Sequence, residues 1–158
     1  MESITTEQEQ KAKTIRETYF DYAGNPTLGE EGFVTRVQML NDKGRVISVA
    51  WLDVEGNPMN IAGETYCRVD YTYDKAGNIN RERYYDAEGQ PVRNAEGYAI
   101  IYREYDASNR VVYEKFYDVD GFAIAIDGGV VAYRYTYDAG GNLLTCTAYD
   151  YFDHEINP

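Results

Sequence analysis

Few residues in this chain could perform nucleophilic or acid–base chemistry. The only histidine is His154, near the C-terminus, and the only serines are Ser3, Ser48 and Ser108. None of them lies in a nucleophile elbow or in a spacing typical of metal ligands. Catalysis of either kind needs a nucleophile and a base that are held together. We therefore expect no enzymatic activity, no catalytic residue and no cofactor.

Acidic pairs are more frequent, and two of them faintly resemble calcium loops. They are Asp118 with Asp120 in "DVDG" and Asp86 with Glu88 in "DAEG". A calcium site needs six or more oxygen ligands, and the third acidic position and distal Glu of an EF-hand are missing here. Two interpretations remain, since the aspartates either cap tight turns or bridge neighbouring repeats through calcium. We expect capped turns and no metal site.

Aromatic residues are the third group with possible chemistry, because the chain has 17 Tyr, 5 Phe and 1 Trp. Four of them form what we call the aromatic ladder, each two residues before an Asp: Tyr19, Trp51, Tyr84 and Phe116. A row of rings on one face could stack against sugar rings, which makes these four the candidate ligand-binding residues. Alternatively, return loops cover the rings, and their burial, at roughly 4 kcal/mol each, serves folding alone.

Composition limits the partners of the chain. Its 158 residues fit one domain or one short repeat array, and its net charge is −12. No cluster of Lys and Arg suits phosphate, so we expect neither nucleic acid nor an anionic membrane as a partner.

No run of about 20 apolar residues predicts a membrane span, and the polar N-terminus is unlike a secretory signal. Cys67 and Cys146 are too few for a disulfide scaffold, so we expect two free thiols.

The elements that position these groups recur with a period of about 32 residues. One family of aspartates has three spacings of 32, and a second has spacings of 32, 33, 32 and 32. Regular self-similarity of this kind is typical of repeat architectures. The first family comprises Asp42, Asp74, Asp106 and Asp138, and the second comprises Asp21, Asp53, Asp86, Asp118 and Asp150.

Each aspartate is expected to open a hairpin turn, usually with Gly three residues later. An Asp side chain caps such a turn, and Gly accepts its left-handed residue. Asn109 replaces Gly in one copy and suits the same conformation. The flanking residues alternate with period two, as in strands. On the strand before a first-family Asp, the odd positions are mostly apolar and include Cys67, so they should face the core.

On the second strand of each hairpin, the first and last residues share a parity and are predicted to face the core. The ladder residues then point to the opposite face. The predicted core positions are Val46, Ile79, Val111 and Leu143 at the start, and Leu52, Tyr85, Tyr117 and Tyr149 at the end.

A return leg should follow each second turn. Pro58 and Pro91 cannot donate to a ladder of hydrogen bonds, so this leg is an edge or a loop. At the N-terminus, Thr5 with Gln8 and Thr6 with Glu9 fit capping boxes, which predicts a short helix over residues 5–13. We expect a cap or linker over residues 1–18, one repeat domain over 19–150 and a tail over 151–158.

Charged residues alternate along the hairpins. Arg81, Arg83 and Lys115 interleave with Glu82 and Glu114, which predicts cross-strand ion pairs on a wet face. Arg103 breaks the apolar pattern on the core face, and a one-residue insertion in "ETYCR" near Glu64 lengthens one repeat. Neither irregularity assembles a reaction.

The turns "YDKAGN", "YDASNR" and "YDAGGN" resemble the YD repeats, also called RHS repeats. Those are cell-surface sequences whose β-hairpins wind into a spiral sheet. The segment "YYDAEGQPVRNAEGYA" is similar to the aromatic hairpins of choline-binding and glucan-binding proteins. The resemblance covers about 130 residues. The period of 32 differs from the 20 or so of those families, and the Trp-based choline cage has only Trp51 here.

The sequence as a whole predicts an all-β fold, a β-hairpin array of solenoid or spiral form with about four repeats. The resemblance implies a bacterial surface or secreted protein, with cell-wall polysaccharide or another protein as the partner. We expect a non-catalytic module that binds cell-wall glycan or another carbohydrate through aromatic side chains. The alternatives are a structural spacer or shell and a protein–protein interaction module.

Overall fold

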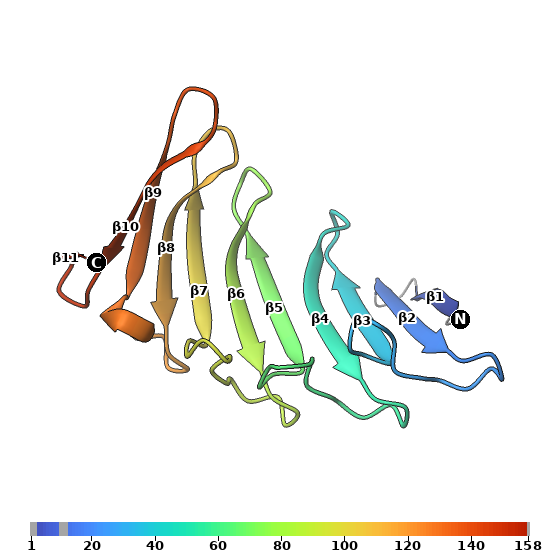
Figure 1. Ribbon diagram of the computed structural model, residues 1–158. Coiled ribbons are helices and arrows are strands. Elements are labelled where there is room, and N and C mark those ends of the chain that lie inside the picture. The colour runs from blue at the N-terminus through green and yellow to red at the C-terminus, as the bar shows by residue number, and fades with distance from the viewer. Residues whose placement is uncertain (1–2, 10–12, 158) are drawn as a thin grey trace. The chain divides into compact units, whose positions relative to one another are not determined.

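The computed structural model describes residues 3–9 and 13–157, and it is all-β. Eleven strands follow one another in the sheet in chain order, joined by antiparallel hairpins (Figure 1). The only helical segment of the described residues is the short 3₁₀ turn η1 (Asp127–Gly129). No helix in the described part is long and apolar enough to cross a membrane. The expected all-β hairpin fold is therefore confirmed.

The chain forms two compact units, whose boundary passes through β5 (Arg68–Tyr73) and β6 (Ile79–Tyr85). Unit 1 comprises Met1–Tyr71 and Tyr84–Val92 and holds β1 (Ser3–Glu9), β2 (Thr14–Phe20), β3 (Thr35–Leu40) and β4 (Val46–Leu52). Unit 2 comprises Thr72–Arg83 and Arg93–Pro158 and holds β7 (Ile100–Tyr105), β8 (Val111–Tyr117), β9 (Ala132–Tyr137), β10 (Leu143–Tyr149) and β11 (Glu155–Ile156).

Most of the described turns are closed by the carboxylate of the aspartate that opens them. In the turn between β7 and β8, Asp106 Oδ1 accepts the backbone N–H groups of Ser108 and Arg110 at 2.9 and 3.0 Å. The backbone N–H of Asn109 donates to the Asp106 carbonyl at 3.0 Å, and Asn109 has a φ of 62°. The Asp-capped turn and the left-handed Asn109 are confirmed. The same pattern closes the turns at Asp53, Asp86, Asp118, Asp138 and Asp150.

In the first hairpin of the sequence repeat, the capping residue is Asn41 and not Asp42, so the predicted anchor is wrong by one position. Asn41 Oδ1 accepts the backbone N–H groups of Lys43 and Arg45, both at 3.0 Å. Asp42 instead forms an exposed ion pair with Lys13. An amide oxygen accepts the same hydrogen bonds as a carboxylate. Counted from Asn41, the spacing between the two turns is the same in this copy of the repeat as in the other copies.

A β-bulge after the turn in the β3–β4, β7–β8 and β9–β10 hairpins changes which residues face the core. In β7 and β8, Tyr105 pairs with Val111, but Glu104 pairs with Tyr113, so Val112 is an extra residue. One extra residue exchanges the two faces along the rest of the strand. Phe116 consequently lies on the same face as its partner Ile101, and both are buried.

The predicted core positions at the ends of the second strands are therefore wrong, whereas Val111 at the start of β8 pairs with Tyr105 and stays on the face of Ile101. The residue that closes each of these strands is only half-buried, and the first residue of β10, Leu143, is 56% exposed. The period-two alternation of the sequence does not reveal the bulge. The half-buried closing residues are Leu52, Tyr85, Tyr117 and Tyr149.

The return legs pair back onto the ends of the second strands. After its second turn, each leg forms an isolated bridge, such as Tyr85 with Pro91 and Leu52 with Pro58. This confirms that both prolines lie outside the central strands. A third turn follows, and in one copy the buried side chain of Asn94 accepts the backbone N–H groups of Glu96, Gly97 and Tyr98.

The helix predicted over residues 5–13 is wrong for residues 5–9, because Ser3–Glu9 forms strand β1 and pairs with β2 along its whole length. Unpaired backbone groups along β2 favour strand pairing with this segment. Residues 10–12 of the predicted helix lie outside the described residues. The predicted C-terminal tail contains β11, which pairs with β10.

We expect Asp86→Ala to lower the free energy of unfolding by about 1 kcal/mol, because two backbone N–H groups lose their acceptor. Asp86→Asn should leave it nearly unchanged, since Asn41 and Asn94 cap turns in this chain. Urea unfolding of the three proteins measures both values. Equal losses in the two variants would contradict a capping role for the Asp86 oxygen.

Candidate functional site

The aromatic ladder lies against the return legs. In unit 1, the ring of Tyr19 is 5.3 Å from that of Phe33. The ring of Tyr66 lies between Trp51 at 6.0 Å and Tyr84 at 4.6 Å. A Cβ on Gly29 would meet the Tyr19 ring at 2.3 Å, so only glycine fits beneath it. Each return leg therefore brings an aromatic side chain or a glycine onto a ladder ring.

The same arrangement occurs in unit 2, where Phe116 contacts Tyr98 at 4.8 Å and Tyr133 at 6.0 Å. Phe116 is 4% exposed and Tyr84 is 6% exposed, whereas Tyr19 and Trp51 are half-buried. The predicted orientation of the ladder, away from the core, is wrong for Tyr84 and Phe116. The structure agrees instead with the alternative from the sequence analysis, in which the return loops cover the ladder rings.

The alternating charges of β6 and β8 lie on opposite faces. Arg83 pairs with Ile100 on one face, and Glu82 pairs with Ile101 on the other. Because successive side chains of a strand point to opposite sides, Arg81 and Arg83 cannot pair with Glu82. The predicted cross-strand ion pairs among these interleaved residues are wrong. Glu82 and Glu114 instead pair with a different residue.

That partner is Arg103, which lies between two carboxylates from the neighbouring strands. Its guanidinium donates to Glu82 at 2.5 Å and to Glu114 at 2.8 Å. Tyr135 O–H donates to the second oxygen of Glu114 at 2.5 Å. Burial alone would lower the pKa of Arg103, but the two carboxylates outweigh it and raise that pKa. Burial and the Glu114 hydrogen bond raise the pKa of Tyr135. Arg103 therefore remains a cation within a compensated cluster.

The opposite face of unit 2 carries tyrosines and cations. Arg134 lies 4.5 Å from the ring centroid of Tyr113, and Arg81 lies 5.5 Å from that of Tyr102. Lys115 Nζ lies 5.7 Å from the ring of Tyr117. Contacts of this length allow cation–π attraction. We call this surface the tyrosine–cation face.

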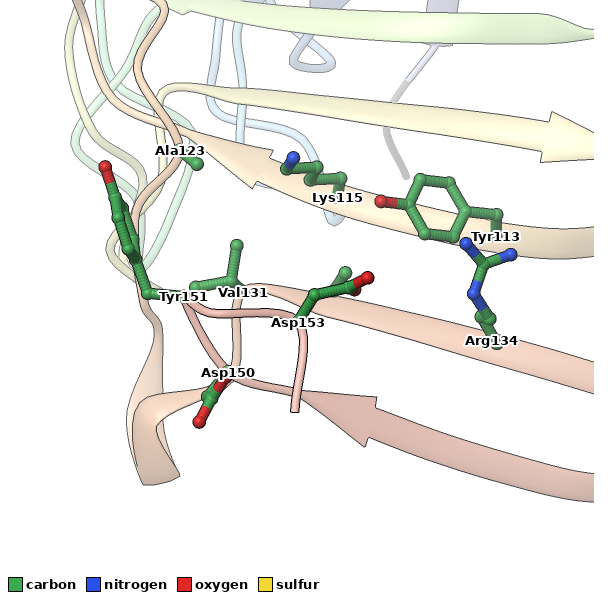
Figure 2. Close-up of a pocket in the computed structure, with 9 residues that line it drawn as sticks. Tyr113, Lys115, Ala123, Val131, Arg134, Asp150, Tyr151 and Asp153 are labelled. Carbon is green, nitrogen blue, oxygen red and sulfur yellow. The ribbon is translucent and has the colours of Figure 1, made fainter. Parts of the chain in front are cut away.

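A groove of about 330 Å³ opens on the tyrosine–cation face near the C-terminus (Figure 2). Figure 2 shows Tyr113, Lys115 and Arg134 on the strands, with Tyr151 and Asp153 on the turn beyond β10. Tyr151 is 62% exposed, and burial raises the pKa of Tyr113, so its phenol stays protonated at neutral pH. Ala123, Val131, Ala132 and Asp150 complete the lining.

The groove combines two aromatic rings with hydrogen-bond donors and one free acceptor. The Asp150 carboxylate accepts the backbone N–H groups of Phe152 and His154, both at 2.9 Å, and thereby shapes the turn. The carboxylate of Asp153 and the cationic groups of Lys115 and Arg134 line the opening. Such a mixture suits a polar, uncharged or anionic ligand with an apolar ring face.

The other candidates from the sequence occupy structural positions. The acidic pairs lie in capped turns, and among residues 3–9 and 13–157 no group of three or more His, Cys, Asp or Glu is placed to hold a metal ion. His154 lies in the last turn, 3.8 Å from Asp150. Both cysteines are free, as expected: Cys67 is buried and Cys146 is exposed. Burial raises the pKa of the Cys67 thiol.

The sequence analysis missed the groove residues Tyr113, Lys115, Arg134, Tyr151 and Asp153. Tyr113 follows the bulge, so its face could not be read from alternation alone. A usable signal did exist at the C-terminal turn, where Tyr151 is followed by Phe152 and the turn glycine is replaced by Asp153. The structure leaves both of these rings exposed.

Comparison of the chain with protein-family models and with curated proteins finds no match. The chain is therefore characterised by its own geometry: the described residues form all-β hairpins, and in unit 2 buried rings lie on one face and the tyrosine–cation face on the other.

Phe116→Ala should lower the free energy of unfolding by about 3–5 kcal/mol, because it leaves a cavity beside Tyr98 and Tyr133. Phe122→Ala is the matched control, since Phe122 is 68% exposed and its loss should cost less than about 0.5 kcal/mol. Thermal and urea unfolding compare the two variants. Similar losses would show that the ladder is not the core of unit 2.

Arg103→Met should lower the free energy of unfolding by about 2 kcal/mol, because it leaves Glu82 and Glu114 without their shared cation. Adding Glu82→Gln and Glu114→Gln to this variant should restore most of the loss. Arg81→Met, on the opposite face, serves as the control. An Arg103→Met protein as stable as the parent would contradict the compensated cluster.

Proposed function

We propose that this chain is a non-catalytic carbohydrate-binding module, a repeat array of solenoid or spiral hairpins from a bacterial surface or secreted protein. The groove beside Tyr113 and Tyr151 carries the proposal. Its volume of about 330 Å³ suits one or two sugar rings. The resemblance of the turns to YD repeats supports the surface location.

The chemistry of the groove supports a sugar ligand. The apolar face of a sugar ring stacks on a tyrosine ring, whose face carries partial negative charge. Sugar hydroxyls both donate and accept hydrogen bonds, so the ammonium of Lys115 and the carboxylate of Asp153 are complementary partners. The ladder residues Tyr19, Trp51, Tyr84 and Phe116 were the sequence-based candidates for this role. With Tyr84 and Phe116 buried, we assign the binding surface to the opposite face and a packing role to the ladder.

A glycan array with the intact chain should identify a ligand, and titration calorimetry should then show about tenfold weaker binding for Tyr151→Ala. That factor corresponds to about 1.4 kcal/mol, a reasonable value for one lost ring contact. Tyr22→Ala is the matched control, because Tyr22 also follows a turn aspartate and is 84% exposed, yet lies in unit 1. If the array shows no bound glycan, or if both variants bind equally more weakly than the parent, the groove is excluded as the binding site.

A further inference from the structure

A second, smaller pocket lies on the tyrosine–cation face of unit 2. Its volume is about 130 Å³, and it is lined by Arg81, Arg83, Ile100, Tyr117 and Gly121. Two of these five residues are arginines, and none is acidic. Arg83, Ile100 and Tyr117 form one row across three neighbouring strands. The pocket is therefore a small concave surface with two arginines in its lining.

The two arginines have no carboxylate partner. Within the described part of unit 2, Arg103 and Arg110 form ion pairs, whereas Arg81, Arg83, Lys115 and Arg134 form none. In a chain of net charge −12, acids are abundant, so four cations without an ion-pair partner on one face are a distinct feature. Exposed cations that are not neutralised by the protein attract anions from solution.

The hydroxyl of Tyr117 adds a neutral donor to the pocket. Burial raises the pKa of Tyr117, an effect that neighbouring Arg81 opposes and Glu104 reinforces. The phenol therefore keeps its proton throughout the neutral range. Guanidinium groups present paired N–H donors that match the two oxygens of a carboxylate.

The pocket and the groove are neighbours along β8. Lys115 lines the groove, and Tyr117, two residues further along the same face, lines the pocket. The Lys115 ammonium lies 5.7 Å from the Tyr117 ring centroid, so these two side chains join the two concavities. One oligosaccharide could therefore contact both.

We propose that the Arg81–Arg83 pocket binds the oxyanion of an acidic sugar residue while a neighbouring sugar of the same chain occupies the groove. This inference rests on the proposed function and specifies its ligand as an acidic glycan. A uronate supplies a carboxylate and a glycan phosphate supplies a phosphodiester, and the two share the negatively charged oxygens that guanidinium groups recognise.

The test compares three probes by titration calorimetry: hexagalacturonate, its methyl ester and a poly(glycerol phosphate). The ester keeps the sugar backbone and removes the charge. The full chain should bind hexagalacturonate at least tenfold more tightly than the ester, and this preference should shrink as salt is raised. Tighter binding of the phosphate polymer than of hexagalacturonate would assign the oxyanion to phosphate instead of a uronate.

The variant is Arg81→Gln with Arg83→Gln, which should lose the tenfold preference and keep the affinity for the ester. Lys43→Gln with Lys75→Gln is the matched control, because it removes the same charge from exposed turns. Thermal unfolding of both double variants checks that each is folded.

The outcomes separate the two proposals. If the ester binds as tightly as hexagalacturonate, or if the arginine variant keeps the preference, the acidic-glycan inference is wrong and carbohydrate binding stands. If the lysine control loses the preference equally, the effect is net charge and the pocket is not the site. If the array and all three probes give no binding, the proposed function itself is wrong.

Discussion

Contact between the ladder rings and the return legs is the interaction on which the rest of this structure depends. A hairpin has no second layer of its own, and the described residues contain no α-helix to cover one face. Apolar area must nevertheless leave water for a unit to be stable. The return legs meet this need, because they bring Phe33, Tyr66 and Tyr98 onto Tyr19, Trp51, Tyr84 and Phe116.

Covering one face of the hairpins leaves the other face free for binding. The buried face holds its charges in compensated clusters, as with Arg103 between Glu82 and Glu114. The tyrosine–cation face holds cations that the protein does not neutralise. Burying an unpaired charge is costly, whereas exposing one costs little, so this division follows from which face the return legs cover. It also determines where a ligand can be bound.

The turns help to determine which residues lie on the covered face and which lie on the tyrosine–cation face. In the β3–β4 and β7–β8 hairpins, an Asn or Asp oxygen closes the turn over two backbone N–H groups, and a bulge follows the turn. The bulge puts Phe116 on the covered face and leaves its neighbour Tyr117 on the other. Adjacent aromatic residues in the sequence thus have different roles, one in packing and the other in the proposed binding of an oxyanion.

The sequence by itself determined the all-β class, the hairpin turns, the positive φ of Asn109 and the exclusion of Pro58 and Pro91 from central strands. These features depend on local chemistry, namely Asp capping, left-handed Asn or Gly, and the missing N–H of proline. Only the tertiary structure decided that Tyr84 is buried rather than Tyr85, and that Ser3–Glu9 is a strand. Those outcomes depend on the bulge register and on a neighbouring strand, and such non-local pairing leaves no periodic mark in the residues concerned. The groove around Tyr113 and Tyr151 joins two strands and a turn, so it too exists only in the folded chain.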